Sequence, residues 1–174
     1  MKTFMMYSVV FIFMLSFTSC DSIDELTEFD FNTTINEQLA VSVPAGEELA
    51  LNETMVINIV NNDTEEYLDV LQNVRITSFK YQFTNFSGDV NGTLVGTFVA
   101  DGVAVLSHDM VVKQTADAGT VFEITDVSVL NSIADKLRAG NNVLIGITGE
   151  SSCDEAMNFT IQLTIGLAIT ADVL

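Results

Sequence analysis

The chain has 174 residues, with 24 acidic against six basic side chains and a formal net charge of −18. This charge argues against nucleic-acid partners and against lying flat on an anionic surface, because both depend on basic patches. The length suits one domain that is large enough to bury its own hydrophobic core.

The first predicted element is an export signal over residues 1–19. Lys2 supplies its positive charge, and an apolar run follows over residues 4–17. A membrane-spanning helix needs about 20 apolar residues, so this run is too short to form one. Its length is typical of a secretory signal. Small residues then lead directly to Ser19 and Cys20.

These residues resemble the lipobox of bacterial lipoproteins. The resemblance implies cleavage between Ser19 and Cys20, and a membrane anchor through lipid on Cys20. Two or three acyl chains give a stable anchor, whereas one chain gives a marginal one. Cys153 then has no disulfide partner within one mature chain. Two alternatives stay open: a cleaved signal without lipid, whose cysteine pairs with Cys153, and a buried apolar N-terminal helix.

An acidic tether is predicted over residues 20–30, which carry many carboxylates. An acidic stretch directly after the cysteine resembles the surface-export signal of Bacteroidota-type lipoproteins, and this resemblance implies the outer membrane or the cell surface. Asp21-Ser22-Ile23 is similar to the short O-glycosylation motif of that group, which implies a glycan on Ser22. The alternative is a plain solvated linker.

Residues 31–174 are predicted to form a single β-domain, because apolar and polar side chains alternate along most of this stretch. Pro44-Ala45-Gly46 and Asp101-Gly102 mark turns between strands. The predicted strands cover residues 29–43, 48–59, 74–86, 93–100, 103–106 with a continuation at 109–113 after a bulge or bend near His108, 120–124, 142–148 and 157–173. The last of these is the clearest, because every odd position is apolar.

Two short helices are expected between the strands. Asp63 is predicted to cap the first helix, with Glu66 at capping-box spacing. Asp126 is predicted to cap the second helix, whose apolar stripe ends at Leu137. Polar loops are expected at residues 116–119 and 151–155.

This pattern predicts an all-β fold with two short helices, an antiparallel two-layer β-sandwich of Ig-like or jelly-roll-like kind, because the elements show no regular βαβ order. A membrane β-barrel is the competing architecture. It needs aromatic girdles on both rims, and the last predicted strand carries one aromatic residue, Phe159.

The sequence contains no recognisable catalytic constellation. His108 is the only histidine, and no second soft ligand lies near it, so we interpret it as a loop or strand-end residue. Cys153 lies among acidic residues that disfavour a reactive thiolate, so we expect a spectator.

Calcium is the one cofactor for which candidate ligands can be named. Asp63, Glu66, Asp89 and Asn91 offer hard oxygen ligands in turns, although neither segment matches a full EF-hand loop. The alternative is that Asp63 caps a helix and Asp89 shapes a turn. No other cofactor is expected.

The sequence therefore predicts a lipid-anchored envelope or surface protein with a non-catalytic binding or structural β-sandwich. Besides the membrane, an envelope protein or a glycan is the expected partner. The alternatives are a glycan-capture module of an uptake system and a fimbrial or adhesin subunit that uses strand exchange. An enzyme is the least favoured class.

Overall fold

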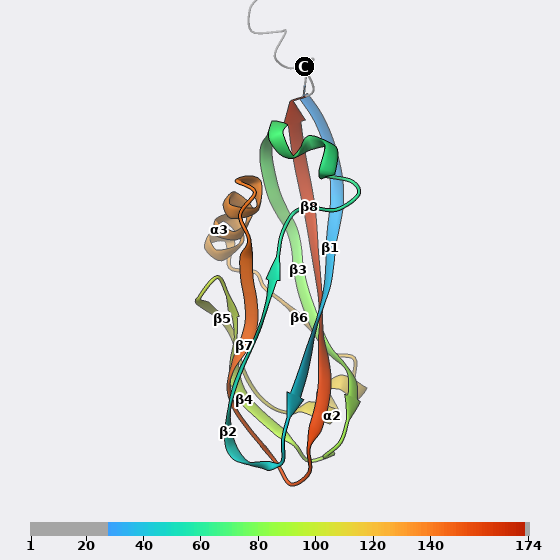
Figure 1. Cartoon of the computed structure of the whole chain (residues 1–174), viewed down its shortest axis with the longest axis vertical. Helices are drawn as coiled ribbons and strands as arrows, with labels where there is room; N and C mark the ends of the chain where they lie inside the picture. Colours follow the sequence, from blue (N-terminus) through green and yellow to red (C-terminus); the bar gives the residue numbers. More distant parts are fainter. Residues whose placement is uncertain (1–27, 173–174) are drawn as a thin grey trace, which may run out of the picture.

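The computed structural model describes residues 28–172, so the predictions on the export signal, Cys20 and Ser22 lie outside the described residues. Eight strands form two four-stranded antiparallel sheets (Figure 1). The strands are β1 (Glu28–Val43), β2 (Gly46–Ile57), β3 (Leu71–Ser87), β4 (Thr93–Ala100), β5 (Val103–Val111), β6 (Val121–Glu123), β7 (Val143–Cys153) and β8 (Met157–Asp172). The predicted β-sandwich is confirmed.

The strand order identifies which kind of sandwich this is. One sheet has the order β1-β8-β3-β6 and the other has the order β2-β7-β4-β5. The first strand pairs with the eighth, the second with the seventh, the third with the sixth and the fourth with the fifth. This is one long hairpin rolled up on itself, which is the arrangement of a jelly roll.

Strand β8 shows how the sequence produces this core. Its odd positions are buried, and its even positions are half-buried except for the exposed Asn158, as predicted from the alternation. It pairs with β1 on one side and with β3 on the other along almost its whole length. Because it is central in its sheet, its apolar face meets the inner face of the opposite sheet.

An aromatic cluster fills the core between β3, β4, β5 and β6. The rings of Tyr81 and Phe98 stack with their centroids 4.0 Å apart, and Phe83 and Phe122 pack around Tyr81. Complete burial of a phenylalanine side chain contributes about 1.5–3 kcal/mol to folding. These rings therefore make a large contribution to the stability of the core between these four strands.

Three helical segments connect the strands. The 3-10 helix η2 covers Glu65–Val70, α2 covers Val112–Asp117 and α3 covers Val127–Arg138. Asp126 caps α3 as predicted, because its carboxylate accepts the N–H groups of Ser128 at 2.9 Å and Val129 at 3.2 Å. Both α2 and α3 pack against β3. Among residues 28–172, no helix combines the length and the apolar character needed to cross a membrane.

Several predicted boundaries are wrong around the helices. The capping box at Asp63 does not form: Thr64 precedes η2, and the Asp63 carboxylate accepts a hydrogen bond from the Thr33 hydroxyl instead. β3 begins at Leu71, three residues before the predicted strand 74–86. Residues 112–117 form α2, where the sequence predicted strand and loop, because the chain leaves the sheet at the buried Val112.

Other differences concern the strands. β1 begins at Glu28, so the last residues of the predicted tether belong to the sheet. β5 continues through His108 as one strand. Its irregularity is a bulge at Val105, which is skipped where β5 pairs with Phe98 and Val99 of β4. β7 extends to Cys153, because pairing with β4 and the edge strand β2 orders residues that look like a polar loop in the sequence.

Candidate functional site

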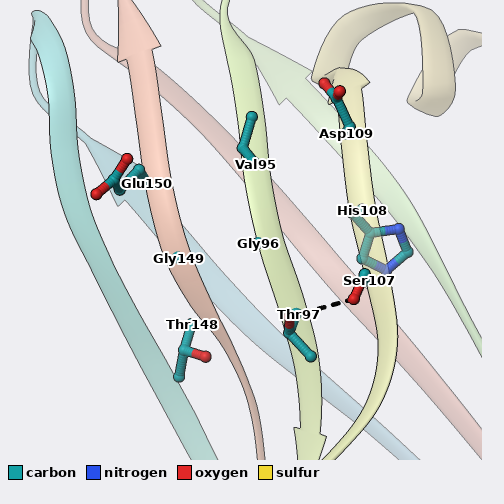
Figure 2. A pocket seen from close by; sticks show the side chains of 9 residues that line it. All are labelled: Val95, Gly96, Thr97, Ser107, His108, Asp109, Thr148, Gly149 and Glu150. Carbon is teal, nitrogen blue, oxygen red and sulfur yellow. Dashed lines mark hydrogen bonds between the residues drawn. The ribbon is translucent and has the colours of Figure 1, made fainter.

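A hollow of about 670 Å³ lies on the outer face of the sheet β2-β7-β4-β5 (Figure 2). It crosses three adjacent strands, and its lining residues are Val95, Gly96, Thr97, Ser107, His108, Asp109, Thr148, Gly149 and Glu150. This site was not predicted from the sequence, because its residues come from three segments that only the sheet brings together.

Two glycines form the floor of this hollow. Gly96 on β4 pairs directly with Gly149 on β7. A Cβ on Gly149 would lie 2.3 Å from the Val95 carbonyl oxygen, and a Cβ on Gly96 would lie 2.6 Å from the Thr148 carbonyl oxygen. Neither strand tolerates a side chain at this crossing. An isolated glycine within a strand often marks such a close approach, so the sequence carried a signal for this site.

Hydroxyl groups line one row of the hollow. Thr148, Thr97 and Ser107 are direct neighbours across β7, β4 and β5. The hydroxyl oxygens of Thr97 and Ser107 lie 3.5 Å apart. Hydroxyl groups both donate and accept hydrogen bonds, so this row suits a polar, uncharged ligand.

Carboxylates mark the next row. Glu150 and Asp109 lie on either side of Val95, whose side chain is 55% exposed. Two strand spacings place the backbones of Glu150 and Asp109 about 10 Å apart, which is too far for both carboxylates to hold one cation unless the side chains converge. Carboxylate oxygens can accept hydrogen bonds from hydroxyl or amino groups.

The ring of His108 does not face this hollow. Adjacent residues of a strand point to opposite faces, so His108 points into the core while Ser107 and Asp109 point outward. Its Nε2 lies 2.6 Å from the Tyr81 hydroxyl, within a hydrogen bond. Burial lowers the pKa of His108 and raises the pKa of Tyr81. The prediction of a loop or strand-end histidine is wrong: His108 lies within β5 and is 7% exposed.

The four calcium candidates do not form one cluster. In the described part of the chain, no group of three or more histidine, cysteine, aspartate or glutamate side chains could hold a metal ion. Asp89 accepts the backbone N–H groups of Asn91 and Asp154. These bonds lower the pKa of Asp89 and tie its turn to the loop after β7. Asp89 therefore shapes a turn, as the alternative interpretation expected.

Cys153 lies at the end of β7 and is buried as a free thiol. Its Sγ donates a hydrogen bond to the Pro44 carbonyl oxygen at 3.2 Å. The thiol therefore joins the two turns at this end of the sandwich and does not contact the hollow.

The comparisons with known proteins concern the fold alone. No family model matches the chain, and no curated protein matches it. The capsid protein of BFDV in its decameric form is 10% identical, with a TM-score of 0.42, over 81% of this chain and 99% of that chain. Desmodium yellow mottle tymovirus gives 9% identity and a TM-score of 0.36, over 83% and 84% of the two chains. Turnip yellow mosaic virus gives 11% and 0.34, over 84% and 96%.

Proposed function

We propose that the chain is an exported, lipid-anchored envelope or surface protein whose jelly roll binds or supports a partner without catalysing a reaction. The observation that carries this proposal is the position of the strand ends. β1 begins at Glu28, which pairs with Asp172 at the end of β8. A tether from Cys20 would therefore enter the domain at one end of its long axis (Figure 1).

The opposite end of the domain faces away from such an anchor. The turn between β1 and β2 and the loop between β7 and β8 lie there together, because Gly46 pairs with Cys153 and Val43 pairs with Met157. The hollow is close to this end, since Gly149 lies only a few residues before Cys153 on β7. An anchored protein would thus present the hollow to partners outside the membrane.

The non-catalytic part of the proposal is supported by the environment of His108. A general base must reach the group from which it takes a proton. The His108 ring is directed at Tyr81, on the other side of the strand from the Ser107 hydroxyl. The three consecutive residues 107–109 therefore do not combine as nucleophile, base and orienting acid.

The anchor is tested by mass spectrometry of the protein made in a bacterial host that carries out lipid modification. We expect a chain that begins at a lipid-modified Cys20 and partitions with the membrane fraction. Cys20→Ser should release the protein into the soluble fraction, while Cys153→Ser, the matched control, should leave it with the membrane. An intact N-terminus or an unmodified thiol at Cys20 would contradict the proposal.

A glycan-capture function is the second candidate, and the chemistry of the hollow favours it. Sugar hydroxyls can donate to the Asp109 and Glu150 carboxylates and exchange hydrogen bonds with the hydroxyl row. On a glycan array, Asp109→Asn combined with Glu150→Gln should lower affinity about tenfold or more, because hydrogen bonds to charged groups contribute about 1.5–3 kcal/mol. Asp154→Asn, outside the hollow, is the control. If the unaltered protein binds no glycan, this candidate is removed and the anchored-protein proposal stands.

Strand exchange through β8 has less support. β8 is hydrogen-bonded to β1 and β3, and donation to a neighbour would break both ladders. A fimbrial or adhesin role would therefore need another strand or surface.

A further inference from the structure

β1 and β2 are edge strands on the same side of the sandwich, here called the open side, and within residues 28–172 no further strand pairs with either outer edge. β1 pairs with β8 along its entire length of 16 residues, without a register shift. Among the described residues, no backbone hydrogen bond joins the other edge of β1 to any segment. Edge strands are commonly protected by proline, lysine or a bulge, and β1 contains none of these.

One carboxylate interrupts the apolar row of β1. Glu37 occupies a core-facing position between Ile35 and Leu39, which are 5% and 8% exposed. It lies directly opposite the buried Leu163, yet its own side chain is exposed. Within residues 28–172, Glu37 makes no ion pair and no side-chain hydrogen bond.

A groove of about 210 Å³ runs beside this part of the edge. Residues 34–37 of β1 form one wall, and Asn58, Val60 and Asn61 form the other. Val60 is 54% exposed. The Asn58 Oδ1 accepts the N–H group of Val60, so the Asn58 Nδ2 can still donate to a neighbouring chain, whereas the Asn61 amide is already hydrogen-bonded within the protein. The groove therefore combines a free backbone edge with both apolar and hydrogen-bonding contacts.

We propose that the β1 edge binds an extended peptide segment of a partner protein, which joins the sheet as a fifth strand and places a lysine or arginine opposite Glu37. Strand addition satisfies the free backbone groups of β1, and side chains at alternate positions provide specificity. Opposite charges on directly facing residues stabilise a strand pair, and like charges destabilise it. The net charge of −18 also favours the approach of a basic segment.

The expected partner sequence follows from the pattern of β1. Side chains that extend the row of Ile35, Leu39 and Val41 should be apolar, and those facing solvent should be polar. The single basic residue fixes the register, because a shift by one residue moves it to the opposite face. This inference goes beyond the anchored-protein proposal and does not depend on the lipid, because the edge belongs to the folded domain.

The test uses the full chain, purified in detergent, and a synthetic peptide in which threonine alternates with valine and the central valine is replaced by lysine. A second peptide carries glutamate at that position. Fluorescence anisotropy should show about tenfold tighter binding of the lysine peptide. Hydrogen exchange of the β1 amides should slow when this peptide binds.

Charge reversal at the edge provides the decisive comparison. Glu37→Lys should reverse the preference in favour of the glutamate peptide, whereas Glu155→Lys, an equal charge change in the loop between β7 and β8, should leave the preference unchanged. Equal binding of the two peptides, or binding of neither, would overturn the proposal. So would a dimer of the protein alone in which β1 amides are already protected, because the occupant would then be a second copy.

Discussion

The sandwich has an open side and an opposite side, which is formed by β5 and β6 and is here called the closed side. Rows of core-facing side chains run across each sheet from one side to the other, and they end differently on the two sides. One row begins at Phe122 on β6, passes through Tyr81 and Leu163, and ends at Glu37 on β1. A second row begins at Leu106 on β5, passes through Phe98 and Ile147, and ends at Glu53 on β2. Each row is apolar on the closed side and ends in a carboxylate on the open side.

The closed side therefore contributes to the stability of the fold, whereas the charges on the open side protect the strand edges. On the closed side, the rings of His108 and Phe122 lie 4.6 Å apart and connect the edges of the two sheets. On the open side, Glu37 and Glu53 place charge where an apolar residue would continue the core. A charged residue pointing inward from an edge strand is a known protection against unselective strand pairing. It also explains how a basic partner segment could still be accepted.

The largest effect is expected for Phe98→Ala on β4, the neighbour of the closed-side strand β5. This change removes the ring that stacks on Tyr81 at 4.0 Å and leaves a cavity in a fully buried position. We expect a loss of about 3–5 kcal/mol in the free energy of unfolding, measured by denaturant titration. Val95→Ala on the same strand but on the outer face should cost less than about 0.5 kcal/mol. Equal losses for the two variants would contradict the difference between the core-facing and the outward-facing side chains of β4.

Tyr81→Phe should have the next largest effect. It keeps the ring and removes the hydroxyl, so Nε2 of His108 loses its partner in the core. An unsatisfied buried polar atom costs about 1–3 kcal/mol, which the same unfolding titration would detect. Tyr67→Phe is the matched control, because no hydrogen bond of the Tyr67 hydroxyl is present among residues 28–172. A loss no greater than that of the control would argue against the Tyr81–His108 hydrogen bond.

The pH dependence should show the same histidine. Burial lowers the pKa of His108 in the folded protein, so below about 6.5, the ordinary value, the unfolded chain binds a proton more readily. The contribution of His108 is fully present above that pH and is lost as the pH falls toward the folded pKa. Unfolding titrations from pH 8 to 5 should show declining stability. His108→Gln should flatten this decline, whereas Asp89→Asn should not, because Asp89 titrates in a more acidic range.

The smallest effect on stability is expected on the open side. Glu37→Gln and Glu53→Gln should each change the free energy of unfolding by less than about 0.5 kcal/mol. The Glu37 side chain is exposed, the Glu53 side chain is only half-buried, and neither has a partner among residues 28–172. The double variant with valine at both positions should instead associate into larger species, which analytical ultracentrifugation would reveal. Thr34→Val combined with Thr54→Val, on the outer faces of the same strands, is the control. Association of the control to the same extent would show that surface hydrophobicity alone is responsible.

Local patterns predicted the elements well where one signal was strong. The alternation over residues 157–173 correctly predicted β8, and Asp126 correctly predicted the start of α3, because both depend on neighbouring residues. α2 escaped prediction, because its short sequence after Val111 carries no cap or extended apolar stripe. The candidate site could be predicted only in part. Gly96 and Gly149 each indicate a close approach of another backbone, but neither segment shows that the two strands pair with each other.

The sequence by itself determined which side chains face inward, since a period of two assigns every residue of a strand to a face. It also determined the export expectation, which depends on residues 1–30, and the negative charge of the surface. Only the tertiary structure decided which strands are neighbours. This pairing brings His108 to Tyr81 and Gly96 to Gly149. It also places Glu37 and Glu53 at the ends of their rows on the same side of the sandwich. The physical reason is that alternation fixes the face of a strand but not its partner, which is selected by packing between segments far apart in the chain.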